Sequence, residues 1–114
     1  MTGVRGASPL RVGLIGCGNH GVYWNLPQIF RCPDVQVVAV CDVDKNHLAE
    51  GRKSVDEHYG PLRGSGYTPC ATYGDFRKLI LRKNVDVVSN HTPDHWHIIP
   101  AIMAQLVDRF QVVF

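Results

Sequence analysis

Three glycines near the start of the chain have the spacing of a phosphate-binding turn. Gly16, Gly18 and Gly21 fit the pattern G-x-G-x-x-G and directly follow a short apolar run at residues 12–15. After a strand, the first glycine allows a tight turn and the second allows a pyrophosphate to approach the backbone closely. The third allows close packing of the next helix, whose N-terminal N–H groups bind phosphate. The motif therefore predicts a dinucleotide site.

A carboxylate follows this turn at the spacing along the sequence that a ribose-binding residue has. The apolar run at residues 35–41 ends at Asp42, about 20 residues after the glycine motif, where an acidic residue can bind a ribose hydroxyl. The alternative interpretation is a glycine-rich turn without a ligand, followed by an aspartate that caps the next helix. We favour the dinucleotide interpretation because two independent features have the required order and spacing.

Three histidines lie close together further along the chain: His91, His95 and His97. Imidazole is a common metal ligand, so a zinc or iron site is an alternative. However, Pro93 prevents a regular helix that would bring His91 and His95 to one face, and residues two apart on a helix point in different directions. We therefore expect no metal site, and a structural or cofactor-positioning role for these histidines. We assign no catalytic residue.

Apolar runs and capping residues predict the elements that position these side chains. Buried parallel strands are expected at residues 11–15, 35–41 and 85–89, with a further short strand within 68–73. Helices are expected at residues 20–30, 45–58, 75–81 and 95–106, with Pro27 interrupting the first and Asp44 and Asp75 as N-caps. Residues 60–66 are expected to form a flexible loop.

This alternation of strands and helices predicts a single-domain α/β fold, a Rossmann-like open parallel sheet with helices on both faces. We expect residues 1–9 to be a disordered lead-in, residues 10–106 to form the dinucleotide-binding domain, and residues 107–114 to be an atypical tail. Residues 111–114 could supply a fifth strand. Gly16, Asp42 and the segment 91–97 would then lie at the carboxyl ends of strands, where such sheets bind ligands.

Composition narrows the class of protein. A chain of 114 residues forms one domain at most, and a formal net charge of +2 gives no reason to expect a nucleic-acid or membrane-surface partner. No apolar run approaches the roughly 20 residues of a membrane span, and we find no secretory signal. The four cysteines form no C-x-x-C pair, which favours reduced thiols and a cytoplasmic location.

The motifs VGLIGCGNHG at residues 12–21 and NHTPDHWH at residues 90–97 resemble those of the Gfo/Idh/MocA family of oxidoreductases. The similarity covers residues 11–104, nearly the whole chain. It implies an N-terminal Rossmann domain that binds NAD or NADP, followed by a larger α/β domain that holds substrate and builds the oligomer. It also implies hydride transfer between the cofactor and a sugar, cyclitol or polyol carbon.

The resemblance also implies which residues bind the cofactor. The pyrophosphate turn corresponds to Gly16, Gly18, Asn19, His20 and Gly21. Asp42 corresponds to the residue at the adenosine ribose, where a carboxylate repels a 2′-phosphate and favours NAD. NADP stays an alternative cofactor, because two cations, Arg52 and Lys53, lie further along the next helix. The segment along the nicotinamide ribose corresponds to Asn90, Thr92, Pro93 and His95.

The chain departs from the family pattern after the last predicted helix. Family members continue there with a glycine turn, a fifth strand and a Glu-Lys-Pro motif whose lysine is commonly assigned to catalysis, and this sequence contains no Glu-Lys-Pro. We therefore expect a truncated member that binds nicotinamide dinucleotide, with its own catalysis undecided. One alternative is a non-catalytic remnant or docking module that self-associates or binds a companion subunit. Another is a nucleotide-sugar or S-adenosylmethionine domain, which would not need the NHTPDHWH segment.

Overall fold

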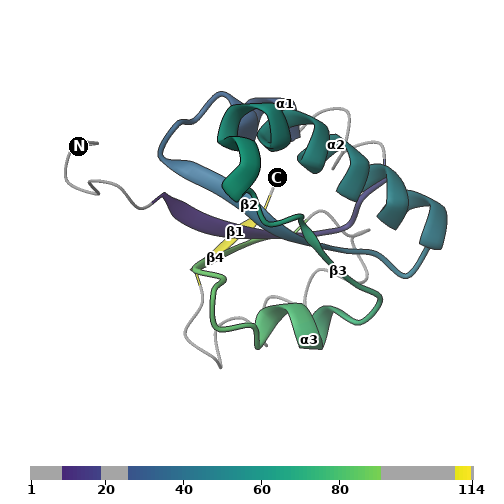
Figure 1. Cartoon of the computed structure of the whole chain (residues 1–114). Coiled ribbons are helices and arrows are strands. Elements are labelled where there is room, and N and C mark those ends of the chain that lie inside the picture. The colour runs from purple at the N-terminus through teal and green to yellow at the C-terminus, as the bar shows by residue number, and fades with distance from the viewer. Residues whose placement is uncertain (1–8, 19–25, 91–109, 114) are drawn as a thin grey trace.

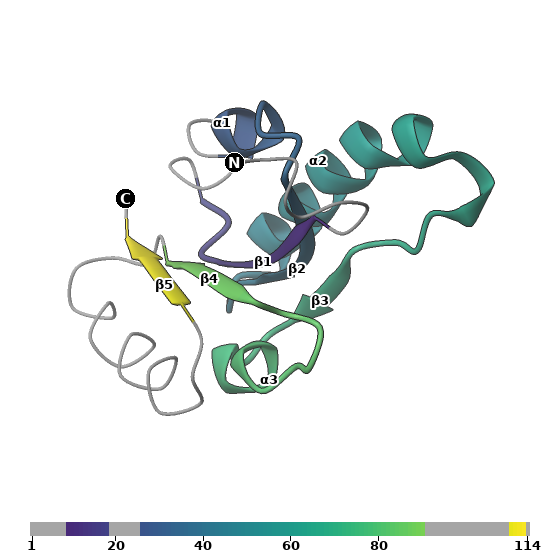
Figure 2. The ribbon, with the colours of Figure 1, turned by 90° about the vertical axis from the view of Figure 1, so that its left-hand side faces the viewer.

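A computed structural model describes residues 9–18, 26–90 and 110–113. These residues form a parallel sheet with the strand order β3-β2-β1-β4-β5. The strands are β1 (Leu10–Ile15), β2 (Val35–Cys41), β3 (Ala71–Tyr73), β4 (Val87–Asn90) and β5 (Phe110–Val113). Figure 2 shows β3 and β5 at opposite edges of this sheet. The predicted α/β fold with a Rossmann-like parallel sheet is confirmed.

Helices cover both faces of the sheet. α1 (Leu26–Phe30) and α2 (Lys45–Arg63) lie on one face, and α3 (Phe76–Ile80) lies on the other (Figure 1). Side chains of β1 alternate between the two cores, because Leu14 packs with the α1 and α2 side and Ile15 packs with the α3 side. No described helix combines the length and the apolar character that crossing a bilayer requires.

Both predicted helix caps are confirmed. The Asp44 carboxylate accepts hydrogen bonds from the backbone N–H groups of Asn46 (2.8 Å) and His47 (3.1 Å) at the start of α2. Asp75 accepts one from the N–H of Arg77 (2.9 Å) at the start of α3. The N–H groups of His47 and Asn46 lower the pKa of Asp44. The stabilisation by this cap is therefore present above the ordinary carboxyl pKa and is lost as the pH falls through the lowered value.

The predicted end of the second helix at His58 is wrong, because α2 continues to Arg63 with Pro61 inside it. Proline has no N–H and so removes one backbone hydrogen bond, and the helix ends only two residues later. Tyr59 anchors this last part of the helix: it is buried, and its hydroxyl accepts a hydrogen bond from the N–H of Val37 on β2 (3.3 Å). The expected loop is thus shorter. It contains a short 3₁₀ helix, η3 (Gly64–Gly66), which begins at a glycine with φ +70°.

The remaining strands lie close to their predicted positions. β3 and β5 confirm the expected third and fifth strands. β4 begins at Val87 rather than at residue 85, because Asp86 makes a separate contact with β1. Its N–H donates to the Arg11 carbonyl (2.8 Å), and its carboxylate accepts from the Arg11 N–H (2.9 Å) and Nε (3.0 Å). Residues 1–8 of the lead-in expected at 1–9, residues 20–25 of the helix expected at 20–30, and the helix expected at 95–106 lie outside the described residues.

Candidate functional site

The predicted turn begins immediately after β1. The Gly16 N–H donates to the Cys41 carbonyl at the end of β2 (2.8 Å), and Gly16 has φ +95°, a conformation that favours glycine. At Gly18 an added Cβ would meet, among the described residues, only the His47 ring, at 3.9 Å. That is an ordinary van der Waals distance. The described protein therefore leaves room at Gly18, as the predicted approach of a pyrophosphate requires.

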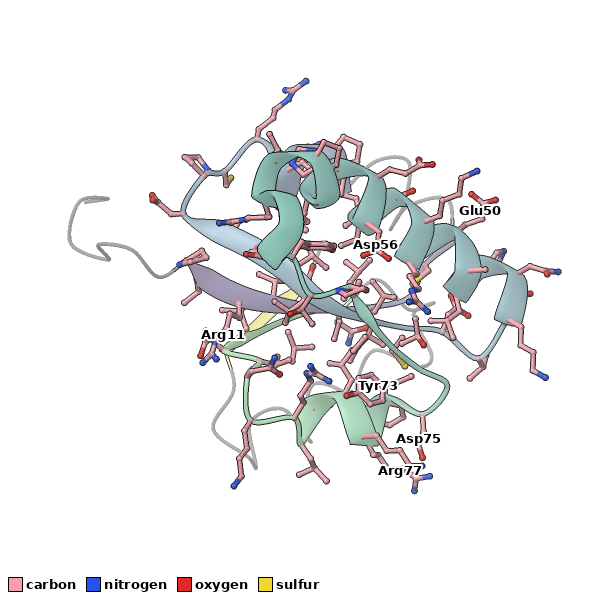
Figure 3. All side chains as sticks on the ribbon, in the orientation of Figure 1. Arg11, Glu50, Asp56, Tyr73, Asp75 and Arg77 are labelled. Carbon is pink, nitrogen blue, oxygen red and sulfur yellow. The ribbon has the colours of Figure 1, made fainter. Side chains whose placement is uncertain are left out.

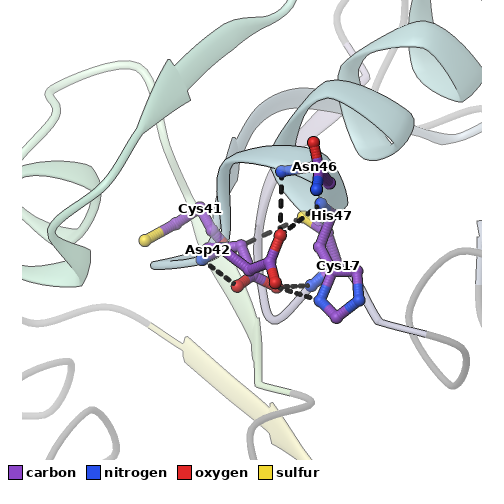
Figure 4. A network of polar contacts seen from close by, with 6 residues as sticks. Cys17, Cys41, Asp42, Asn46 and His47 are labelled. Atoms are coloured by element: carbon purple, nitrogen blue, oxygen red, sulfur yellow. Dashed lines mark hydrogen bonds and ion pairs between the residues drawn. The ribbon is translucent and has the colours of Figure 1, made fainter.

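Asp42 joins this turn to the start of α2 (Figure 4). One oxygen of its carboxylate, Oδ2, accepts the N–H of Cys17 at 2.7 Å, and the other, Oδ1, accepts the N–H of Asp44 at 2.8 Å. The side chain is 12% exposed. The helix-capping alternative for Asp42 is wrong, because Asp44 caps α2. Asp42 instead fixes the turn after β1 relative to the loop after β2.

Among the described residues, a histidine lies beside Asp42 that was not identified from the sequence as part of the site. His47 Nδ1 lies 3.8 Å from Asp42 Oδ2, and the His47 side chain is 52% exposed. By contrast, Arg52 Nε lies 3.4 Å from Asp56 Oδ2, one helical turn further along α2. The position of His47 in the sequence could have indicated its contact with Asp42. His47 is the third residue after the N-cap Asp44, so it lies in the first turn of the helix, beside the preceding loop.

Gly51 is a second residue that sequence reasoning missed. An added Cβ at Gly51 would lie 2.8 Å from Cys17 Sγ and 3.1 Å from Cys17 Cβ. The helix therefore approaches the glycine turn so closely that there is no room for a side chain. The four-residue spacing of His47, Gly51 and the buried Val55 puts them on one side of α2, and this periodicity could have indicated the contact.

Three of the four described candidate residues lie together at the carboxyl ends of neighbouring strands: Gly16, Asp42 and Asn90. Asn90 is fully buried at the end of β4 and pairs in register with Ile15, the residue before Gly16. Asp42 directly follows β2 and contacts the same turn; the fourth, Gly18, lies two residues after Gly16 in that turn. The other candidates lie outside the described residues: Asn19, His20, Gly21, Thr92, Pro93 and His95. Their assignment to the cofactor site stays a prediction.

The metal alternative also falls largely outside the described residues, since His91, His95 and His97 belong to the segment 91–109. Within residues 9–18, 26–90 and 110–113, no group of three or more His, Cys, Asp or Glu side chains is arranged to hold a metal ion.

Three of the four cysteine thiols are expected to be unreactive in the folded protein. Burial raises the pKa of Cys17, and the charge of Asp42 raises it further. Burial is also the main cause that raises the pKa of Cys41 and of Cys70 to about 12. Cys32 is exposed, and all four thiols are free. A chromogenic disulfide reagent at neutral pH should therefore modify Cys32 alone, and the other three after unfolding in denaturant. Rapid release of more than one equivalent from the folded chain would contradict this.

Several curated proteins are similar to this chain in sequence. No protein-family model matches the chain. It is 35% identical over 97 residues to a protein named glycosyl hydrolase family 109 protein from Saccharopolyspora erythraea, covering 83% of this chain and 20% of that protein. It is 33% identical over 106 residues to glycosyl hydrolase family 109 protein 2 from Shewanella sp. strain ANA-3, covering 91% and 22%. The chain thus spans about a fifth of the length of these curated relatives.

Solved structures share the fold. Scyllo-inositol dehydrogenase from Lactobacillus casei, with bound NAD(H) and scyllo-inositol, superposes with a TM-score of 0.75 at 15% identity, over 93% of this chain and 28% of that one. KijD10, a 3-ketoreductase from Actinomadura kijaniata in complex with NADP, superposes with a TM-score of 0.72 at 21% identity, over 93% and 30%. In sequence and fold, the chain is similar to the N-terminal Rossmann domain of Gfo/Idh/MocA-type oxidoreductases.

Proposed function

We propose that the chain binds a nicotinamide dinucleotide at the carboxyl edge of its sheet, with Asp42 as the ribose ligand. The observation that carries this proposal is the position of the Asp42 carboxylate, fixed by the N–H groups of Cys17 and Asp44 beside the glycine turn. A carboxylate has about four acceptor positions, so two backbone donors leave capacity for ribose hydroxyls. Structures that share the fold contain NAD(H) or NADP, which supports the same ligand class.

NAD is the expected cofactor, and NADP should bind more weakly. A fixed carboxylate repels a 2′-phosphate and accepts hydrogen bonds from free hydroxyls. Arg52 and Lys53 were the cations that left NADP possible; in the structure Arg52 lies beside Asp56, and Lys53 is exposed on α2. Among the described residues, the Asp42 carboxylate therefore decides the expected selectivity for NAD.

The longer protein to which such a domain belongs would act on a sugar or polyol. The names of the relatives support this substrate class, since they describe an inositol dehydrogenase, a 3-ketoreductase and glycosyl hydrolases. We place no catalytic residue among the described residues.

Calorimetric titration of the 114-residue chain with NAD and then NADP tests the binding proposal directly. The sharpest variant is Gly18→Ala, because the added methyl group meets only His47 at 3.9 Å among the described residues but would occupy the space expected for the pyrophosphate. We expect NAD affinity to fall about tenfold or more with the melting temperature almost unchanged.

The matched control is Gly60→Ala, the same substitution in α2 at a position where an added Cβ meets nothing within 4 Å. It should leave NAD affinity unchanged and stabilise the helix slightly. Absence of binding heat with either cofactor, from a chain that circular dichroism shows to be folded, would rule out the proposal. Tighter binding of S-adenosylmethionine than of NAD would favour the competing ligand class.

A further inference from the structure

A cleft separates the first half of β2 from the segment that leads into β3. The ladder between these strands begins only at Ala39 and Ala71. Just before it, the Asp56 carboxylate of α2 accepts hydrogen bonds from the Tyr67 hydroxyl (2.7 Å) and the Cys70 N–H (2.8 Å). Asp56 lies beneath α2 on the side that faces the sheet (Figure 3). These two bonds hold Tyr67 and Cys70 against α2, and the ladder with β2 begins only after Cys70.

An irregularity in β2 lies at the same place. Val12 of β1 pairs with Val37, and the next residue, Gly13, pairs with Ala39, so Val38 is an extra residue in the strand. Such bulges redirect side chains and occur often beside binding sites. Val38 lines the cleft together with Gln36. The cleft is therefore produced by two separate features of the fold, the bulge and the Asp56 contacts.

The cleft has the size of a small ligand and a positively charged lining. Its volume is about 240 Å³, below the roughly 300–1,000 Å³ of sites for drug-sized molecules. Its polar side chains are those of Gln36, Arg63, Tyr67, Thr68, Arg82 and Asn84. None of the described residues that line it is acidic. Two guanidinium groups without a carboxylate in the lining favour an anion.

Part of the lining is already oriented. Arg82 Nε donates to the Asn84 amide oxygen, and Arg82 Nη1 donates to the Tyr73 hydroxyl. Both bonds fix the plane of the Arg82 guanidinium. Because the amide oxygen of Asn84 accepts from Arg82, the amide NH₂ is the end of Asn84 that remains to donate to a ligand. Arg63 is exposed at the end of α2 and can close on a ligand from the solvent side.

We propose that this cleft, lined by Arg63, Arg82, Asn84, Gln36 and Thr68, binds a small oxyanion of the phosphate class. Arginine guanidinium groups bind phosphate through paired hydrogen bonds, and the amide and hydroxyl groups supply further donors. The cleft lies beside the first half of β2, whereas the glycine turn lies beyond the carboxyl end of β1. Gln36 and Cys41 are about 16 Å apart along β2, so the oxyanion site is separate from the proposed cofactor site.

Inorganic phosphate is the probe, titrated into the ¹⁵N-labelled full chain at constant ionic strength, with chloride and acetate as reference anions. We expect saturable amide shifts at Gln36, Thr68 and Asn84 with phosphate, a weaker response to acetate and none to chloride. Saturating NAD should leave these shifts unchanged. Shifts confined to the glycine turn, or abolished by NAD, would overturn the proposal, as would equal shifts with chloride.

Arg63→Gln should weaken phosphate binding about tenfold, because it removes a charged donor from the cleft. Arg31→Gln is the matched control, since it removes the same charge from another exposed position, after α1. An equal loss in both variants would show a general effect of net charge and overturn the site. Neither variant alters Asp42 or the glycine turn, so this result is independent of whether the chain binds NAD.

Discussion

Replacing Asp42 by alanine is expected to weaken NAD binding by at least tenfold and to lower the free energy of unfolding by about 2 kcal/mol. The variant removes the proposed ribose ligand and also leaves the N–H groups of Cys17 and Asp44 without their acceptor. An unsatisfied buried donor destabilises a protein by roughly 1–3 kcal/mol, and the Cys17 N–H is the more buried of the two. Calorimetry and thermal melting measure the two effects on the same sample.

Asp44→Ala separates binding from stability. It removes the cap of α2 but leaves the backbone N–H that contacts Asp42. We expect it to lower the melting temperature while NAD affinity stays close to that of the unmodified chain. Asp42→Asn, which keeps an acceptor oxygen and removes the charge, should narrow the difference between NAD and NADP. Unchanged NAD affinity in Asp42→Ala would contradict the assignment of Asp42.

Gly51→Ala is expected to destabilise the protein although alanine is the better helix former. The helical preference for alanine is about 1 kcal/mol, whereas excess volume in a packed interior destabilises by roughly 1–3 kcal/mol. The added Cβ would lie 2.8 Å from Cys17 Sγ and 3.1 Å from Cys17 Cβ, so either α2 or the glycine turn must move. We expect a net loss of about 1 kcal/mol in denaturant unfolding and weaker NAD binding.

A second substitution tests the cause. Cys17→Ala removes the sulfur atom that the new methyl group would meet, so it should restore part of the stability when it is combined with Gly51→Ala. Gly60→Ala in the same helix has free space around the new methyl group and should stabilise. If Gly51→Ala stabilised the chain as much as Gly60→Ala does, the close approach of α2 to the turn would be refuted.

Local chemistry explains which elements could be predicted from the sequence. The limits of β2 and the caps Asp44 and Asp75 follow from residues next to each other in the chain. The end of α2 could not be predicted in this way. Gly60 and Pro61 normally indicate a loop. Here the hydrogen bond between the Tyr59 hydroxyl and the N–H of Val37, which lies much earlier in the chain on β2, holds the end of the helix in place.

The same distinction holds for the candidate site. The order of the glycine turn and Asp42 along the chain predicts that they meet, because both follow parallel strands of one sheet. The positions of His47 and Gly51 depend on how closely α2 packs against the turn, and that distance is set by tertiary packing. The role of Asp56, which holds Tyr67 and Cys70 against α2, likewise has no signature in the local sequence.

The position of β1 in the middle of the sheet has a consequence for how the chain is made. One partner of β1, the strand β2, leaves the ribosome soon after β1. The partner on the other side of β1 is β4, which is synthesised far later, since the Arg11–Asp86 contact spans 75 residues. Until then one edge of β1 exposes the unpaired backbone of a strand whose last four residues are buried in the finished fold. Such an edge invites pairing with other chains. During synthesis, the interval before β4 emerges is therefore when this domain most needs protection from aggregation.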